Sequence, residues 1–237
     1  MPFLFGYNQY MFIFNFDRLS DPLFWRSLAC MIPVMLLSLT VHEWGHAFAA
    51  HKCGDDTARN LGRMTLNPLR HIDPIGFLMI LLVGFGWAKP VPVNPRNYRN
   101  YKTGEAIVSL AGVCMNLICM LVFSVLYVIF LCLLIKEGYQ WLTNGLLLEI
   151  TAYGIVLNCS LAVFNLLPFY PLDGYHIFEL IFGRVLPIRV FLFLRRYGQF
   201  ILIGILLIFR LIQFYPIQEL AGLLIGGLGR LAFNIVF

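Results

Sequence analysis

Three ionisable side chains lie close together in an otherwise apolar stretch of the chain. His42, Glu43 and His46 form the pattern H-E-x-x-H inside the run from residue 27 to residue 50. Ionisable groups at membrane depth are costly and usually have a function. On a helix, His42 and His46 are four positions apart and share one face, so both imidazoles can bind one metal ion. The pattern therefore predicts a zinc site within a membrane helix.

Glu43 is next to the first of these ligands and borders the same cleft. It can take a proton from a zinc-bound water, because the metal lowers the pKa of that water to about 7. It can then pass the proton to the amine that leaves when a peptide bond is cut. We expect Glu43 to be the catalytic base. The alternative is that these three residues are buried for packing alone, which is costly if they lack partners.

A catalytic zinc ion takes three protein ligands and keeps one position open, so the sequence should contain a third ligand. His51 follows His46 by five positions and is rotated off the ligand face. His71 and Asp73 precede a proline, and a turn or helix-cap role explains them better than metal binding.

Asp173 is the better candidate for the third ligand. Pro168 and Pro171 interrupt an apolar span shortly before Asp173 and Gly174. A broken helix that lines a polar cavity is the way a chain provides a ligand at membrane depth. A simple Asp-Gly turn is the alternative interpretation.

The composition indicates an integral membrane protein. Charged residues make up 12% of the 237 residues and hydrophobic residues 60%, whereas soluble domains carry about 25% charge. No basic tract accompanies the net charge of +5, so we expect no nucleic-acid partner. The six cysteines form no C-x-x-C pair, and no disulfide framework is visible.

Hydropathy predicts an all-α polytopic bundle that forms a single membrane domain over residues 1–237. Candidate spans cover about residues 26–50, 105–135, 146–167, 197–211 and 217–237. Residues 1–16 are aromatic and apolar but shorter than a span, so whether they cross is left open. The glycine-rich run 75–88 is too short to cross, and we interpret it as a re-entrant element.

Two segments near the motif have strand character, residues 63–66 and residues 89–93. Their prolines suit a sheet edge, which could pair with an unwound substrate by strand addition. The alternative is a loop that only supports the membrane-embedded site.

The basic residues gather on one side of the membrane if the run 75–88 does not cross. By the positive-inside rule this side is cytoplasmic, and we expect the site to face it. The residues are Lys52, Arg59, Arg63, Arg70, Lys89, Arg96, Arg99, Lys102, Arg184, Arg189, Arg195 and Arg196.

Several motifs together resemble the site-2 protease family of intramembrane zinc metalloproteases, peptidase family M50. They are His42-Glu43-x-x-His46, Asn116 at the end of A-G-V-C-M-N, and Asn165-x-x-Pro168-x-x-x-x-Asp173-Gly174. The stretch F-G-W-A-K-P-V-P-V-N-P at residues 85–95 looks like a signature of the compact prokaryotic branch. The resemblance covers about residues 34–176, and the catalytic core is expected at about residues 26–176.

The resemblance implies a fold of about six transmembrane helices around a core of three. It implies that His42, His46 and Asp173 bind one Zn²⁺ ion per chain and that Glu43 is the base. The partners implied are transmembrane protein substrates and the lipid bilayer, in a prokaryotic cell membrane. The chain shows no PDZ-like insertion and no CBS-like tail, so we expect a minimal core.

The family pattern also places Asn116 near the catalytic cleft, where it could position the substrate or stabilise the oxyanion. Hydrogen bonding between helices is the alternative for Asn116 and the preferred interpretation for Asn165. The chain departs from the family pattern at Val113 and Tyr170, where prolines are common. Neither position is a ligand, so the departures affect local helix geometry only.

Two other functions are alternatives to proteolysis. A zinc transporter or zinc sensor also buries His and acidic residues, but it needs polar groups along the whole membrane path. Here they gather at one depth. An inactive adaptor that only binds transmembrane helices would have no need for the complete set of ligands and base.

Overall fold

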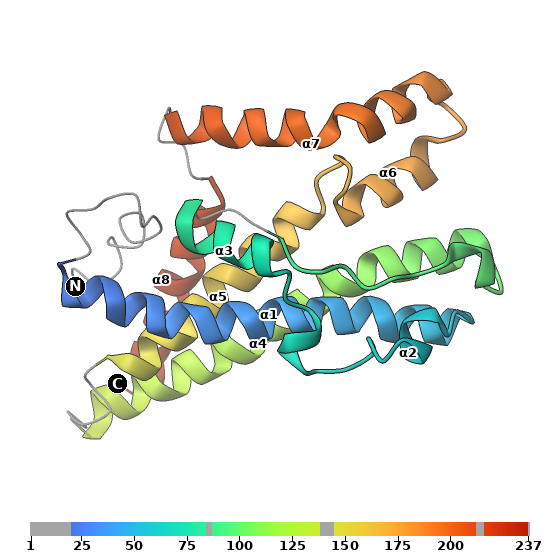
Figure 1. Ribbon diagram of the computed structural model, residues 1–237. Helices are drawn as coiled ribbons and strands as arrows, with labels where there is room; N and C mark the ends of the chain where they lie inside the picture. The colour runs from blue at the N-terminus through green and yellow to red at the C-terminus, as the bar shows by residue number, and fades with distance from the viewer. Residues whose placement is uncertain (1–19, 84–86, 138–144, 212–215, 237) are drawn as a thin grey trace.

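The computed structural model describes residues 20–83, 87–137, 145–211 and 216–236. In these ranges the chain is helical and forms no strand, apart from one isolated antiparallel bridge between Ile72 and Ala88. The elements, shown in Figure 1, are α1 (Pro22–Cys53), α2 (Thr57–Asn60), η3 (Pro68–Arg70), α3 (Pro74–Val83), η4 (Pro95–Asn97), α4 (Tyr101–Glu137), α5 (Leu146–Asn165), α6 (Asp173–Phe182), α7 (Ile188–Leu211) and α8 (Pro216–Val236).

Five helices in the described part of the chain are long and apolar enough to cross a membrane, and they lie in α1, α4, α5, α7 and α8. The predicted all-α membrane fold is confirmed. Residues 1–16, which the sequence left undecided as a span, lie outside the described residues.

The core consists of α1, α4 and α5, which all pack against one another. In Figure 1, α4 and α5 run side by side and both cross α1. The side chain of Asp21 caps the start of α1, and Pro22 occupies the first turn, where its missing N–H costs nothing. The helix ends at Cys53 and is capped by Gly54, whose φ of 111° lies in the left-handed region that glycine adopts freely.

The remaining long helices differ in which core helices they contact. α8 packs against α4 and α5, and α6 packs against α4. α7 contacts α6 through the rings of Phe191 and Phe178, whose centroids are 5.9 Å apart. Arg195 of α7 adds hydrogen bonds to Tyr175 and Glu179 of α6. α6 therefore links α7 to the core.

The predicted re-entrant run 75–88 overlaps α3, a helix of 10 residues, and residues 84–86 of the run lie outside the described part of the chain. The length of α3 is about 15 Å, roughly half the thickness of the hydrocarbon layer, so it cannot span the membrane. The strands expected at residues 63–66 and 89–93 were wrong, since neither segment is in a strand. Pro90 and Pro92 lack the N–H that a ladder needs, and the side chain of Arg63 takes the carbonyls of Lys89 and Pro90.

The helix α7 begins nine residues earlier than expected, at Ile188 rather than near residue 197. Arg189, Arg195 and Arg196 lower the hydropathy of its first turns, but backbone hydrogen bonds continue the helix regardless of polarity. The charge of Arg195 is paired there, because Glu179 of α6 accepts a hydrogen bond from it at 2.9 Å.

Candidate active site

The two histidines of the motif lie in the middle of the core. His42 is buried and His46 is partly buried, both on the side of α1 that faces α4. The absence of a side chain on one residue of α4 makes room for the two imidazole rings. A Cβ atom on Gly112 of α4 would lie 2.5 Å from both His42 Cε1 and His46 Nε2. Glycine at position 112 therefore lets α4 pass directly against the imidazoles.

The third candidate ligand, Asp173, comes from α6, which packs against α4. Asp173 is the first residue of α6, directly after the irregular turn that follows α5. Gly174 holds this turn tight, because a Cβ atom there would lie 2.3 Å from the carbonyl oxygen of Leu166. Two further contacts fix α6: His176 Nδ1 lies 2.8 Å from Glu105 Oε1 of α4, and Arg195 donates to the Tyr175 hydroxyl.

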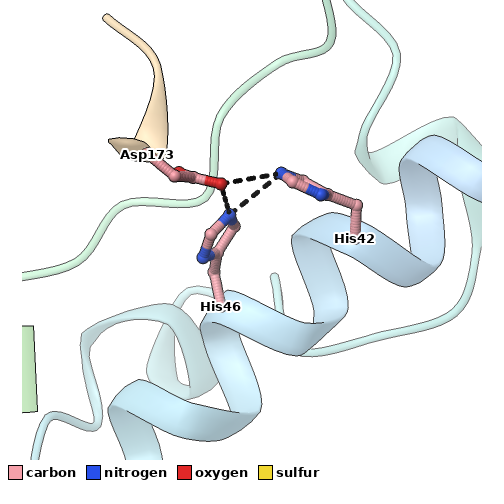
Figure 2. Close-up of side chains that lie close together, drawn as sticks. All are labelled: His42, His46 and Asp173. Atoms are coloured by element: carbon pink, nitrogen blue, oxygen red, sulfur yellow. Dashed lines mark hydrogen bonds and ion pairs between the residues drawn. The ribbon is translucent and has the colours of Figure 1, made fainter. Parts of the chain in front are cut away.

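Figure 2 shows His42, His46 and Asp173 pointing toward one another. The two Nε2 atoms are 3.0 Å apart, and Asp173 Oδ2 is 3.4 Å from His42 Nε2 and 3.3 Å from His46 Nε2. One ligand atom from each residue thus forms a small triangle. The structure brings together the three residues that the sequence predicted as ligands.

Hydrogen bonds set the tautomer of each ring. His46 Nδ1 lies 2.8 Å from the carbonyl oxygen of Val108, which can only accept, so Nδ1 carries the proton. His42 Nδ1 lies 2.6 Å from Asn116 Oδ1, which accepts in the same way. In the neutral rings, each Nε2 is therefore left with a lone pair that faces the triangle.

A cation fits this arrangement. Two nitrogen lone pairs and a carboxylate oxygen converge, and Asp173 Oδ2 is buried without a hydrogen-bond partner among the described residues. A tetrahedral zinc ion with ligand bonds of about 2.0–2.1 Å places neighbouring ligand atoms about 3.3 Å apart. The edges of the triangle, 3.0–3.4 Å, agree with this spacing. The donor set of two histidines and one carboxylate is one that catalytic zinc sites use.

The role of Asn116 can be followed through its contacts. The residue is fully buried, and its Nδ2 donates to Asn158 Oδ1 at 3.0 Å and to the carbonyl of Ser38 at 3.4 Å. Asn158 in turn donates to the Ser38 hydroxyl. These contacts join α1, α4 and α5 behind His42, as the helix–helix alternative expects. The substrate-positioning role of Asn116 stays a prediction.

Glu43, the predicted base, is partly buried on α1. Its Oε2 accepts a hydrogen bond of 2.8 Å from the backbone N–H of Val91, in the loop that follows α3. This N–H is therefore not free for strand addition to a substrate, and the loop-support alternative agrees better with the structure.

The other polar residues near the motif have local roles. His51 pairs with Asp56, and Asp73 accepts from the N–H of Gly76 at the start of α3. Asn165 donates to the carbonyl of Leu161 within its own helix. None of these side chains belongs to the metal-binding group found among the described residues.

Sequence reasoning missed three contributors to the site: Asn158, the carbonyl of Val108 and the N–H of Val91. Asn158 could have been found, because a polar amide in an apolar span is a signal of its own. The two backbone groups have no signature in the sequence, since every residue has a backbone carbonyl and every residue except proline has a backbone N–H.

Comparisons with known proteins give similarity to peptidases. A family model described as "Peptidase family M50" matches residues 132–209, a range that includes Asp173. The chain is 42% identical over 154 residues to the "Putative zinc metalloprotease YwhC" of Bacillus subtilis. The aligned region covers 63% of this chain and 67% of that protein. The chain is 33% identical over 149 residues to the "Putative zinc metalloprotease Rip2" of Mycolicibacterium smegmatis, covering 61% and 54%. No solved structure matches.

Proposed function

Because this chain belongs to the site-2 protease family, peptidase family M50, and is a zinc metallopeptidase, we propose that it hydrolyses peptide bonds within or near transmembrane segments of other membrane proteins. The observation that carries this proposal is the triangle of His42, His46 and Asp173 inside a bundle of membrane-crossing helices, with Glu43 beside it. Such a site can reach a bond that soluble proteases cannot reach. The family assigns the chain to peptidases rather than to zinc transporters, the alternative considered from the sequence.

In this proposal His42, His46 and Asp173 hold one Zn²⁺ ion per chain. An ion held there would supply a water of lowered pKa and a Lewis acid for a peptide carbonyl. Val108 and Asn116 keep the ring protons of the two histidines away from the triangle. The chain thus presents three anionic or lone-pair donors to a cation without a further conformational change.

Glu43 moves the proton. Its Oε2 is engaged by the N–H of Val91, which leaves Oε1 to take a proton from the attacking water. Oε1 then gives the proton to the leaving amine, so the base is restored at the end of each cycle. Substrates are single helices of other membrane proteins, which must unwind locally before their backbone can enter the site.

We further propose a cell-membrane location with the site facing the cytoplasm. The zinc-binding triangle lies seven to eleven residues before the end of α1 at Cys53. The loop that follows this end contains Arg59, Arg63 and Arg70. A basic loop next to a transmembrane helix favours the cytoplasmic side.

A reconstitution experiment tests the function. The purified chain is placed in liposomes with a panel of single-span membrane proteins, and the new termini are identified by mass spectrometry. We expect cuts within or next to the apolar segment, abolished by a chelator and restored by added Zn²⁺. Cleavage that persists in chelator, or cuts confined to soluble portions far from the membrane, would contradict the proposal.

A further inference from the structure

The proposed base, Glu43, is contacted by a loop that lies outside the membrane-spanning helices. Val91 N–H donates to Glu43 Oε2 across 48 positions of sequence. Val91 is 8% exposed and packs against Ala47 of α1 and Ala58 of α2. Pro90 and Pro92 flank it and have no N–H, so Val91 supplies the one backbone donor of that tripeptide.

The loop is locally stiff. Proline fixes φ at residues 90 and 92, and it also restricts the residues before it, Lys89 and Val91, to extended conformations. The direction of the Val91 N–H therefore depends mainly on how the two ends of the segment are anchored.

Side chains from outside the membrane-spanning helices supply both anchors. On one side, Arg63 Nη2 donates to the carbonyl oxygens of Lys89 at 2.8 Å and Pro90 at 3.3 Å. On the other side, Asp55 Oδ2 accepts from the N–H of Asn94 at 2.6 Å. Because Arg63 binds the carbonyl that precedes Val91 in the chain, its hydrogen bonds orient the peptide plane containing the Val91 N–H.

We propose that Arg63 is a positioning residue for Glu43: it holds the Lys89–Pro90 backbone so that Val91 N–H fixes the base. This inference rests on the proposed function. Glu43 has three rotatable side-chain bonds, and one fixed oxygen reduces the orientations that Oε1 can take. Without Arg63 the base samples unproductive orientations, and a misplacement of about 1 Å is enough to slow a reaction by up to about 100-fold.

Three variants test the assignment. Arg63→Met removes the donors but keeps the apolar stem, and Arg63→Lys restores a single donor with its charge. Arg59→Met is the matched control, because Arg59 lies four residues away, is 57% exposed and pairs with Asp56 instead. All variants are made in the full chain and compared in liposomes with a cleaved single-span substrate.

We expect Arg63→Met to lower kcat about tenfold with KM within twofold of wild type and zinc content unchanged. Arg63→Lys should recover part of the loss, and Arg59→Met should match wild type. Deuterium exchange should be faster over residues 89–94 in Arg63→Met and unchanged in Arg59→Met, a readout that does not depend on activity.

An unchanged kcat in Arg63→Met would overturn the inference. So would a rise in KM alone, which would place the loop on the substrate, or a loss of zinc, which would make Arg63 a general structural residue. Unaltered deuterium exchange over residues 89–94 in Arg63→Met would also overturn the inference, because the loop would then not depend on Arg63. If the wild-type protein held zinc but cleaved no substrate, the proposed function itself would be overturned instead.

Discussion

Val108 and Asn116 decide which nitrogen of each imidazole faces the metal position. Both groups accept a hydrogen bond at Nδ1 and so direct Nε2 toward Asp173. Three electron-pair donors converge at 3.0–3.4 Å from one another, a spacing that suits a shared cation. At the scale of single residues, the site is built to bind a positive ion.

The assignment of Asp173 as the third ligand leads to a prediction about zinc content. Asp173→Ala removes one of three donors, so we expect zinc binding to weaken by more than the roughly 10–100-fold that loss of an outer-shell partner costs. Metal analysis of purified protein after dialysis against a weak chelator measures the effect. A zinc content in Asp173→Ala equal to that of wild type would show that another group completes the site.

At the scale of elements, the end of α1 is tied to the loop that contacts Glu43. Asp55 follows the C-terminal Gly54 and is fully buried. Its carboxylate accepts from the N–H of Asn94, from both Thr57 donors and from the Asn97 amide. This one side chain joins α1, α2 and the segment before α4.

Asp55 makes the stability of this region depend on pH. Burial alone would raise the pKa of its carboxyl, but the hydrogen bonds from Asn94, Thr57 and Asn97 outweigh burial and hold the pKa below its usual value. The folded pKa is therefore lower than the unfolded value of about 3.9. The stabilisation is present above about pH 4 and is lost as the pH falls from there through the folded pKa.

Asp55→Asn checks this linkage. At pH 7 we expect the variant to be less stable by about 1–3 kcal/mol, because buried donors lose a charged acceptor. The difference in apparent Tm between wild type and variant should shrink as the pH falls from 5 to about 3. Thermal unfolding in detergent measures it, with the exposed Asp56→Asn as control. A difference that is constant over this pH range would refute the account.

At the scale of the whole molecule, the sequence was sufficient for the elements that hydropathy controls. The helices α4, α5 and α8 begin and end within a few residues of the predicted spans. The start of α7 was misplaced because its arginines lower the local hydropathy. The pairing of Arg195 with Glu179 of α6 is a tertiary contact that local composition does not reveal.

For the site, the candidate ligands were predictable from the sequence, but the groups that orient the site were predictable only in part. The i, i+4 spacing identified His42 and His46, and the proline-broken span together with the family resemblance identified Asp173. The contacts that orient His46 and Glu43 were not predictable, because they are made by backbone groups of Val108 and Val91. The strand expectation failed for a related reason: the side chain of Arg63 occupies carbonyls that a strand would need.

Glu43→Gln tests the central claim most directly. The substitution keeps the shape of the side chain and leaves the three metal-binding residues intact, so zinc content should equal that of wild type. Cleavage of a reconstituted single-span substrate should fall by about 100-fold or more, because the proton acceptor is lost. Cleavage by zinc-loaded Glu43→Gln at a rate within a few fold of wild type would contradict the claim that Glu43 is the base of a zinc-dependent proteolysis within the membrane.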